Sequence, residues 1–380
     1  MAIQNFVAYN PVRLHFGEGV VQTLGETIKQ YGKHVLLLYG KGSVKKYGYY
    51  DEVTGILKNA GLQITEFGGI QPNPLVDDVR RAIALGKEKK VDVILALGGG
   101  SVIDSAKIVS VGLVHDIDPW QFMLWQAFPE QSVPLVTVLT LAATGTEMNA
   151  AAVLQNTETG KKVGFVHPEL FPKDSFLDPA YTVTVPKDYT AYGIADLIAH
   201  ALEAFFGKGE PSVIDRITVD IIKDAMEQAP LLLNDLKNTA WRANIMLDAT
   251  LALNGLTNYG RSSGDWGVHA LGHELSLLYG MPHGATLSIV YPAWLKLQAG
   301  RIPKRIQKLG DLLFGLTDIE TVIQKLEVFF KSIDCPVRLA DAGIDESKKE
   351  EILHQMNKNQ DSGMVYLLND ADRKQIVEYM

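Results

Sequence analysis

Two continuous apolar runs in the first half of the chain constrain its fold more than any other feature. The runs are HVLLLYG at 34–40 and VDVILAL at 91–97, and glycine ends or follows each of them. A run that is apolar at every position is typical of a parallel strand that is covered on both faces. Helical patterns at 43–60 and 75–89 lie between the runs. These β-α repeats with short loops predict a parallel sheet with helices on both faces.

Shorter strand patterns extend this sheet and add two hairpins. Further strands are predicted at 63–67 and 134–140. The stretch AAVLQN-TETG-KKVGFV at 151–166 predicts a hairpin with a glycine-containing turn. FVAYN and RLHFG, which a proline separates near the N-terminus, predict a second short hairpin.

The pattern changes near Pro186, after which only helical periods of comparable strength occur. Helices are predicted at 188–206, 212–227, 239–254, 265–278, 285–298, 321–332, 347–357 and 371–379. A length of 380 residues also favours two domains. The predicted domains are an α/β domain over 1–186 and an all-helical domain over 187–380.

Three glycines and a serine, Gly98-Gly99-Gly100-Ser101, stand where the second apolar strand meets the next helix. Backbone N–H groups at such a junction form an anion site that suits a pyrophosphate. A tight turn that needs glycine only for its conformation is the alternative. The spacings G-x-G-x-x-G and G-x-x-x-x-G-K-[ST] are both absent, so the common dinucleotide and P-loop fingerprints do not apply.

A second glycine-containing loop, Gly40-Lys41-Gly42-Ser43, follows the first apolar strand. Many NAD-selective sites place an acidic residue near this point to bind the ribose hydroxyls. This loop offers glycines, a cation and a hydroxyl instead, which would suit the 2′-phosphate of NADP. A helix start capped by Ser43 is the alternative interpretation.

One aspartate and four histidines in the second half indicate a metal site. Asp196 and His200 are four residues apart, as are His269 and His273. In a helix each pair lies on one face, about 6 Å apart at Cβ, and could bind one ion. His283 follows Met-Pro, so we expect it to approach from a loop or a helix start. This set suits zinc or ferrous iron. The alternative is that these are core histidines that only pack and form hydrogen bonds. Spacing alone does not decide which of the histidines bind the ion.

Composition excludes several classes of protein. The chain is 47% hydrophobic and 21% charged, which is ordinary for a globular protein. A formal net charge of −8 argues against nucleic acid or an anionic membrane as the main partner. The single cysteine excludes an internal disulfide, and the N-terminus lacks a signal-peptide pattern. We therefore expect a cytoplasmic protein.

These motifs, in this order, resemble the iron-containing (metal-dependent, group III) alcohol dehydrogenase family. GGGSVIDSAK at 98–107 is similar to its pyrophosphate motif, and TLAATGTEMN at 140–149 to its T-x-x-A-T-G-[ST]-E segment. GIADLIAHALE, HALGH and MPHG are similar to its metal motifs. The resemblance covers essentially the whole chain. YGKGSVKKYG and FGGIQPNP are most similar to the butanol dehydrogenase and NADPH-dependent aldehyde reductase branch.

The resemblance implies a dehydroquinate synthase-like dinucleotide-binding α/β domain with a parallel sheet, followed by an all-α metal-binding domain. By position, the family's four metal ligands fall on Asp196, His200, His269 and His283. His273 corresponds to a family histidine that lies beside the metal, near the nicotinamide, without binding the ion. These five residues are the expected catalytic residues, and one Fe²⁺ or Zn²⁺ per chain is the expected metal.

The resemblance also implies the cofactor contacts. Together with the two glycine-containing loops, the expected cofactor-binding residues are Gly40, Lys41, Gly42, Ser43, Asn73, Gly98, Gly99, Gly100, Ser101, Asp104, Thr140, Thr144, Asn149 and Lys162. Asn149 and Lys162 would lie nearer the ribose and nicotinamide. Family members that choose NAD often carry Asp where this chain has Gly40, so NADP(H) is favoured over NAD(H).

The activity that the resemblance implies is hydride transfer between NAD(P)H and a small or medium aldehyde or primary alcohol, such as butanal and butanol, by a homodimer. A dehydroquinate synthase-like or glycerol-1-phosphate dehydrogenase-like enzyme is one alternative. Such enzymes typically bind zinc with a Glu and two His, and Asp196 with His200 weighs against them. A non-catalytic metal- or nucleotide-binding protein is another alternative. A metal-dependent hydrolase would leave GGGS and TLAATGTE unexplained.

Overall fold

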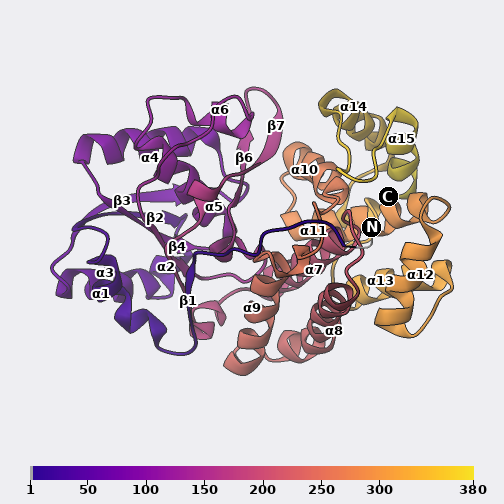
Figure 1. Cartoon of the computed structure of the whole chain (residues 1–380), viewed down its shortest axis with the longest axis horizontal. Coiled ribbons are helices and arrows are strands. Elements are labelled where there is room, and N and C mark those ends of the chain that lie inside the picture. The colour runs from indigo at the N-terminus through magenta and orange to yellow at the C-terminus, as the bar shows by residue number, and fades with distance from the viewer. Residues whose placement is uncertain (1–2) are drawn as a thin grey trace. The chain divides into compact units, whose positions relative to one another are not determined.

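The computed structural model describes residues 3–380, which divide into two units (Figure 1). The α/β unit comprises Asn10–Val185 and Leu236–Met246. The helical unit comprises the described residues before Asn10 together with Pro186–Asp235 and Leu247–Met380.

A six-stranded sheet in the order β1-β8-β5-β4-β2-β3 forms the centre of the α/β unit, and every neighbouring pair is parallel. Its strands are β1 (Arg13–Phe16), β2 (His34–Gly40), β3 (Gln63–Ile70), β4 (Val93–Gly98), β5 (Leu135–Leu139) and β8 (Asp174–Leu177). A separate antiparallel hairpin consists of β6 (Ala151–Asn156) and β7 (Lys161–Val166). The predicted parallel sheet and the 151–166 hairpin are confirmed.

The predicted hairpin at the N-terminus was wrong. RLHFG supplies β1, but residues 6–10 form no strand, and β1 pairs in parallel with β8. Side chains reinforce this distant pairing, because Arg13 and His15 on β1 both contact the buried Asp174 carboxylate of β8. The partner of β1 is about 160 residues downstream, beyond the reach of a local pattern.

The alternation of side chains along β2 explains why its whole sequence is apolar. Leu36 and Leu38 pack into one hydrophobic cluster with α4 and α5, while Val35, Leu37 and Tyr39 pack into a second with α1 and α3. Successive strand residues point to opposite faces, so a strand with helices on both sides needs apolar residues at every position. The predicted two-sided packing is confirmed.

The helices of the α/β unit follow the predicted order, with two differences. They are α1 (Leu24–Ile28), α2 (Ser43–Lys46), α3 (Tyr49–Asn59), α4 (Val76–Lys89), α5 (Gly100–Gly112) and α6 (Pro119–Met123). The single helix predicted at 43–60 is two helices, because Gly48 between them adopts the left-handed φ of 83°. The polar-faced helix that the sequence predicts at about 20–31 is instead a 3₁₀ turn followed by the short α1.

The helical unit contains no β-strand among its described residues. Its helices are α7 (Lys187–Phe205), α8 (Ser212–Asn234), the C-terminal part of α9 (Thr239–Leu253), α10 (Gly267–Tyr279), α11 (His283–Gln298), α12 (Pro303–Phe314), α13 (Ile319–Ser332), α14 (Lys349–Asn359) and α15 (Asp370–Tyr379). The expected α/β plus all-α fold class is therefore confirmed. Within the described residues, no helix combines the length and apolar character that a membrane span requires.

Helices α7 and α11 approach each other closely at Gly284. A Cβ atom added there would lie 1.9 Å from the main-chain oxygen of Tyr192, so only glycine fits. This contact brings the first turn of α11, which begins at His283, against α7 at Tyr192. The glycine of the MPHG motif therefore places its neighbouring histidine.

Candidate metal and cofactor sites

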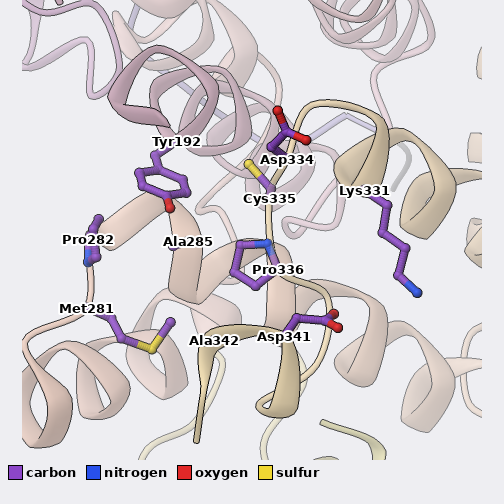
Figure 2. A pocket seen from close by; sticks show the side chains of 10 residues that line it. All are labelled: Tyr192, Met281, Pro282, Ala285, Lys331, Asp334, Cys335, Pro336, Asp341 and Ala342. Atoms are coloured by element: carbon purple, nitrogen blue, oxygen red, sulfur yellow. The ribbon is translucent and has the colours of Figure 1, made fainter. Parts of the chain in front are cut away.

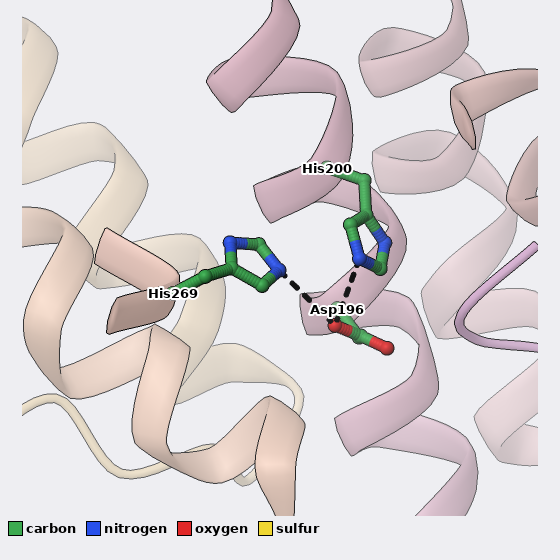
Figure 3. A group of neighbouring side chains, drawn as sticks. All are labelled: Asp196, His200 and His269. Carbon is green, nitrogen blue, oxygen red and sulfur yellow. Dashed lines mark ion pairs between the residues drawn. The ribbon is translucent and has the colours of Figure 1, made fainter. Parts of the chain in front are cut away.

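Three imidazoles converge on one aspartate in the helical unit. The Oδ1 atom of Asp196 lies 3.7 Å from Nε2 of His200, 3.9 Å from Nε2 of His269 and 3.7 Å from Nε2 of His283. Figure 3 shows the first three residues, with Asp196 and His200 one turn apart on α7 and His269 facing them from α10. His283 approaches from the start of α11, as predicted from the Met-Pro before it.

These distances suit a shared ion better than direct hydrogen bonds. Each of the three exceeds the usual length of an N–H···O hydrogen bond. Ligand atoms about 2.0–2.2 Å from a tetrahedral ion lie roughly 3.4 Å apart, close to the separations seen here. Suitable ligand atoms of Asp196, His200 and His269 all lie within 4.8 Å of one another, and all three residues are buried. The set could hold one divalent metal ion.

Glu203 orients His269, and sequence reasoning missed this residue. Its Oε1 atom accepts hydrogen bonds from Nδ1 of His269 at 3.0 Å and from the backbone N–H of His269 at 3.1 Å. Its Oε2 atom accepts a bond of 2.6 Å from the backbone N–H of Trp266. With Nδ1 donating to Glu203, Nε2 carries the lone pair, and this buried atom has no hydrogen-bond partner in the described chain. A carboxylate behind a ligating imidazole is the usual arrangement around a bound metal.

A further buried acid, Asp265, lies next to Glu203. Its backbone N–H donates to the Glu203 carbonyl, and its carboxylate accepts from the backbone N–H groups of Val365 and Tyr366. Burial, and then the neighbouring Glu203 charge, raise the pKa of Asp265. Asp196, Glu203 and Asp265 thus concentrate acidic groups in a buried region, which a bound cation would compensate electrostatically.

His273 lies beside this cluster and is more exposed than the α10 ligand candidate. It follows His269 by one turn of α10, and its ring centroid is 5.3 Å from that of His283. His273 is partly exposed, whereas His269 is buried. The structure therefore brings together all five residues that the sequence placed in one site.

The glycines of the turn before α5 are required because a larger residue would clash with its neighbours, and not because the backbone is left-handed. None of Gly98, Gly99 and Gly100 has a positive φ. A Cβ atom on Gly100 would lie 2.8 Å from Thr144, and one on Gly99 would lie 3.1 Å from Leu141. The conformational alternative considered for this turn was therefore wrong. The turn opens the 13-residue helix α5, whose first N–H groups can bind a phosphate.

The 140–149 segment contacts α5 through a polar network. The Asp104 carboxylate accepts from the Thr146 hydroxyl at 2.6 Å and from the backbone N–H of Val153 at 2.9 Å. Lys107, one turn later and fully buried, donates to Thr146 and Asn149. Sequence reasoning missed Lys107, although it is the last residue of the GGGSVIDSAK motif.

Two other expected cofactor residues meet directly. The Lys162 ammonium on β7 donates to the side-chain oxygen of Asn73 at 2.8 Å. Asn73 adopts a φ of 57°, which asparagine tolerates better than most residues. The turn before α4 and the hairpin thus present an amide and a cation side by side.

The structure of the loop after β2 contradicts one of the two interpretations of its sequence. Gly42 is the N-cap of α2, which begins at Ser43 and has only four residues, and no side-chain cap hydrogen bond is present. The interpretation of Ser43 as a helix cap was therefore wrong. Lys41 and Ser43 are exposed, and Lys45 lies over the rings of Tyr39 and Tyr50, at 4.7 and 4.4 Å from their centroids.

A cavity of about 590 Å³ in the helical unit does not contain the metal-site residues (Figure 2). Met281 and Pro282, just before His283, form part of its wall, and Tyr192 and Cys335 also line it. Burial raises the pKa of the Cys335 thiol to about 12, so this thiol stays protonated at neutral pH. Cys335 is therefore not a candidate nucleophile.

Comparisons with known proteins match both halves of the chain. A family model described as iron-containing alcohol dehydrogenase matches residues 11–179. A second model, described as the C-terminal part of the Fe-containing alcohol dehydrogenase family, matches residues 190–380.

Individual relatives match over nearly their full length. The chain is 40% identical over 379 residues to a probable NADH-dependent butanol dehydrogenase of Bacillus subtilis, covering 97% of this chain and 98% of the relative. It is 36% identical over 380 residues to an NADPH-dependent aldehyde reductase of Escherichia coli, covering 97% and 96%. The crystal structure of NADH-dependent butanol dehydrogenase A from Thermotoga maritima superposes with a TM-score of 0.96 at 36% identity, covering 100% of this chain and 99% of that one.

Proposed function

Because the chain belongs to the iron-containing alcohol dehydrogenase family, we propose that it interconverts butanal-sized aldehydes and primary alcohols with NADP(H) and one Fe²⁺ or Zn²⁺ ion. Family membership makes the chain an oxidoreductase, an alcohol dehydrogenase or aldehyde reductase that uses a metal and a nicotinamide cofactor. Relatives named butanol dehydrogenase and aldehyde reductase support the proposed size and type of substrate.

The observation that carries the proposal is the convergence of three imidazole Nε2 atoms on Asp196 Oδ1. We assign Asp196, His200, His269 and His283 as the ligands. Three neutral imidazoles and one carboxylate would leave a divalent ion with a formal charge of +1. When bound, the metal supplies Lewis acidity toward the substrate oxygen, and the nicotinamide supplies the hydride. Glu203 holds the His269 ring in the orientation and tautomer that this role requires.

We assign His273 as the residue that moves a proton between the substrate oxygen and solvent through its imidazole nitrogens. Its partial exposure and its place beside His283 support this role. Proton transfer by a positioned side chain typically contributes 10²–10⁴-fold. We expect His273→Ala to lower kcat by on the order of 100-fold and to remove a titration from the pH–rate profile. Steady-state rates across pH, with the metal content verified at the wild-type level, test this. Unchanged turnover and an unchanged profile would contradict it.

The loop after β2 supports the preference for NADP(H). No acidic residue occurs between Gly40 and Gly48, whereas lysines occupy positions 41, 45 and 46. All three lysines are exposed. Acidic side chains at this point select the ribose hydroxyls of NAD, and cations accommodate the 2′-phosphate of NADP.

Gly40 offers a sharp test of this preference. A Cβ atom there would meet nothing closer than 3.8 Å, and the backbone has no positive φ, so a side chain can be added. We expect Gly40→Asp to lower kcat/KM for NADPH by about tenfold or more through repulsion of the 2′-phosphate, with a smaller effect on NADH. The control is Gly40→Asn, which has a similar shape without the charge. Equal losses with both cofactors, or in both variants, would contradict the assignment.

A further inference from the structure

We propose that Lys107 is a positioning residue for cofactor binding, which fixes the shape of the 144–151 segment through its buried ammonium group. The inference rests on the proposed function, because it takes this segment to be part of the NADP(H) site. It adds a role that neither the spacing of the motifs nor the family resemblance assigned to Lys107.

The contacts of the ammonium group carry the inference. The side chain of Lys107 is fully buried, and its Nζ atom lies 2.7 Å from the Thr146 hydroxyl and 2.7 Å from the carbonyl oxygen of Ala151. It also lies 2.8 Å from the carbonyl oxygen and 3.0 Å from the side-chain oxygen of Asn149. One cation on α5 therefore gathers four oxygen atoms from three residues of a segment about 40 residues downstream.

Other bonds make this segment depend on the same centre. The Thr146 hydroxyl donates to the Asp104 carboxylate of α5 and accepts from the Lys107 ammonium group of the same helix. The Asn149 side chain is used within the segment as well, since its oxygen accepts from the Ala151 N–H and its amide donates to the Gly145 carbonyl. We therefore assign Asn149 to shaping the segment rather than to a ribose contact.

The position of the segment determines the space at the phosphate-binding turn. Thr144 lies so close to Gly100 that a single methyl group between them would meet it at 2.8 Å. The Thr144 hydroxyl also accepts from the backbone N–H of Thr146 at 3.3 Å. A displacement of Thr146 would thus shift Thr144 against the first residue of α5, where the pyrophosphate is proposed to bind.

A charged donor suits this place better than a neutral one. Burial lowers the pKa of Lys107 to about 8, and the facing charges of Asp104 and Glu147 oppose that shift. The four surrounding oxygen atoms are acceptors that an ammonium group, with three N–H donors, can satisfy and an apolar side chain cannot. Without the cation the carbonyl oxygens of Asn149 and Ala151 would lose this donor, and the segment would rearrange to reach water.

The test compares NADPH binding by the metal-loaded wild type with that of Lys107→Met and Lys107→Arg, using quenching of NADPH fluorescence. We expect Lys107→Met to raise the Kd for NADPH between about tenfold and a hundredfold, and Lys107→Arg to restore part of the loss. Metal content should remain at the wild-type level, because the metal ligands lie in the helical unit. The matched control is Ser105→Ala, a fully buried residue of the same helix whose hydroxyl bonds, within residues 3–380, to the Ser101 carbonyl alone.

Two further results distinguish a failure of this inference from a failure of the variant to fold and from a failure of the proposed function. If Lys107→Met does not fold, Thr146→Val decides, since it removes the hydroxyl that joins Lys107 to Asp104 and should raise Kd severalfold with the fold retained. Wild-type Kd in the folded Lys107 or Thr146 variant would overturn the inference alone. A metal-loaded wild type that binds neither NADPH nor NADH would overturn the proposed function and the inference with it.

Discussion

Asp196→Ala is expected to abolish metal binding and activity while the fold is retained. Its carboxylate is the one atom group that all three imidazoles face, so its removal leaves only neutral ligands on separate elements. A metal contributes several kcal/mol to the stabilisation of a developing oxyanion, so we expect kcat/KM to fall by roughly a thousandfold or more. Helix α7 should persist, because it packs against α8 and α11 along its length.

Elemental analysis of the purified variant, together with circular dichroism, measures both parts of this prediction. His200→Ala should behave in the same way, and His354→Ala is the matched control, because His354 is an exposed histidine of α14. The control should keep one metal ion per chain and wild-type activity. Retained metal stoichiometry in either site variant would overturn the ligand assignment.

Glu203→Gln is expected to weaken metal binding by about 10- to 100-fold, although Glu203 touches no metal. The amide can still accept from His269 through its oxygen, but its NH₂ group would then face the N–H of Trp266 donor to donor. The strained left-handed backbone of Trp266, with a φ of 64°, depends on that bond. Both effects should loosen the His269 ring, and activity should return as the metal concentration is raised.

Competition with a metallochromic chelator gives the metal affinity directly. Glu274→Gln is the matched control, because Glu274 is an equally buried glutamate on α10 that bonds to Asn359 and not to the histidines. The Glu203 assignment fails if Glu203→Gln and Glu274→Gln hold metal with the same affinity as the wild type.

Local patterns were sufficient where one element determines the outcome. The unbroken apolar character of β2 and β4 predicted a sheet covered on both faces, and both clusters of side chains are present. The four-residue spacings predicted that Asp196 and His200 share one helix face, and His269 and His273 another, which the helices α7 and α10 confirm. Spacing left the fourth ligand open, because the choice between His273 and His283 depends on how α10 and α11 pack.

Residues whose role depends on distant partners could not be recognised in this way. Glu203 is one turn beyond His200, but its function comes from the N-terminus of α10, which lies 63–66 residues later. Lys107 appears in the sequence as a polar residue in an apolar helix, and its acceptors are 39–44 residues downstream. The pairing of β1 with β8 has the same character. In each case the role depends on contacts between segments that are remote in the sequence.

The role of the metal and the choice of cofactor are both tested by the initial rate of butanal reduction, with NADPH and NADH side by side, before and after chelation and with Fe²⁺ or Zn²⁺ added back. We expect rapid oxidation of NADPH, slower oxidation of NADH, loss of both on chelation and recovery with metal. Preference for NADH would retain the metal-dependent enzyme and discard the role of the Gly40 loop. An undiminished rate after verified removal of the metal would contradict the assignment of the Asp196 cluster as the site of the catalytic ion.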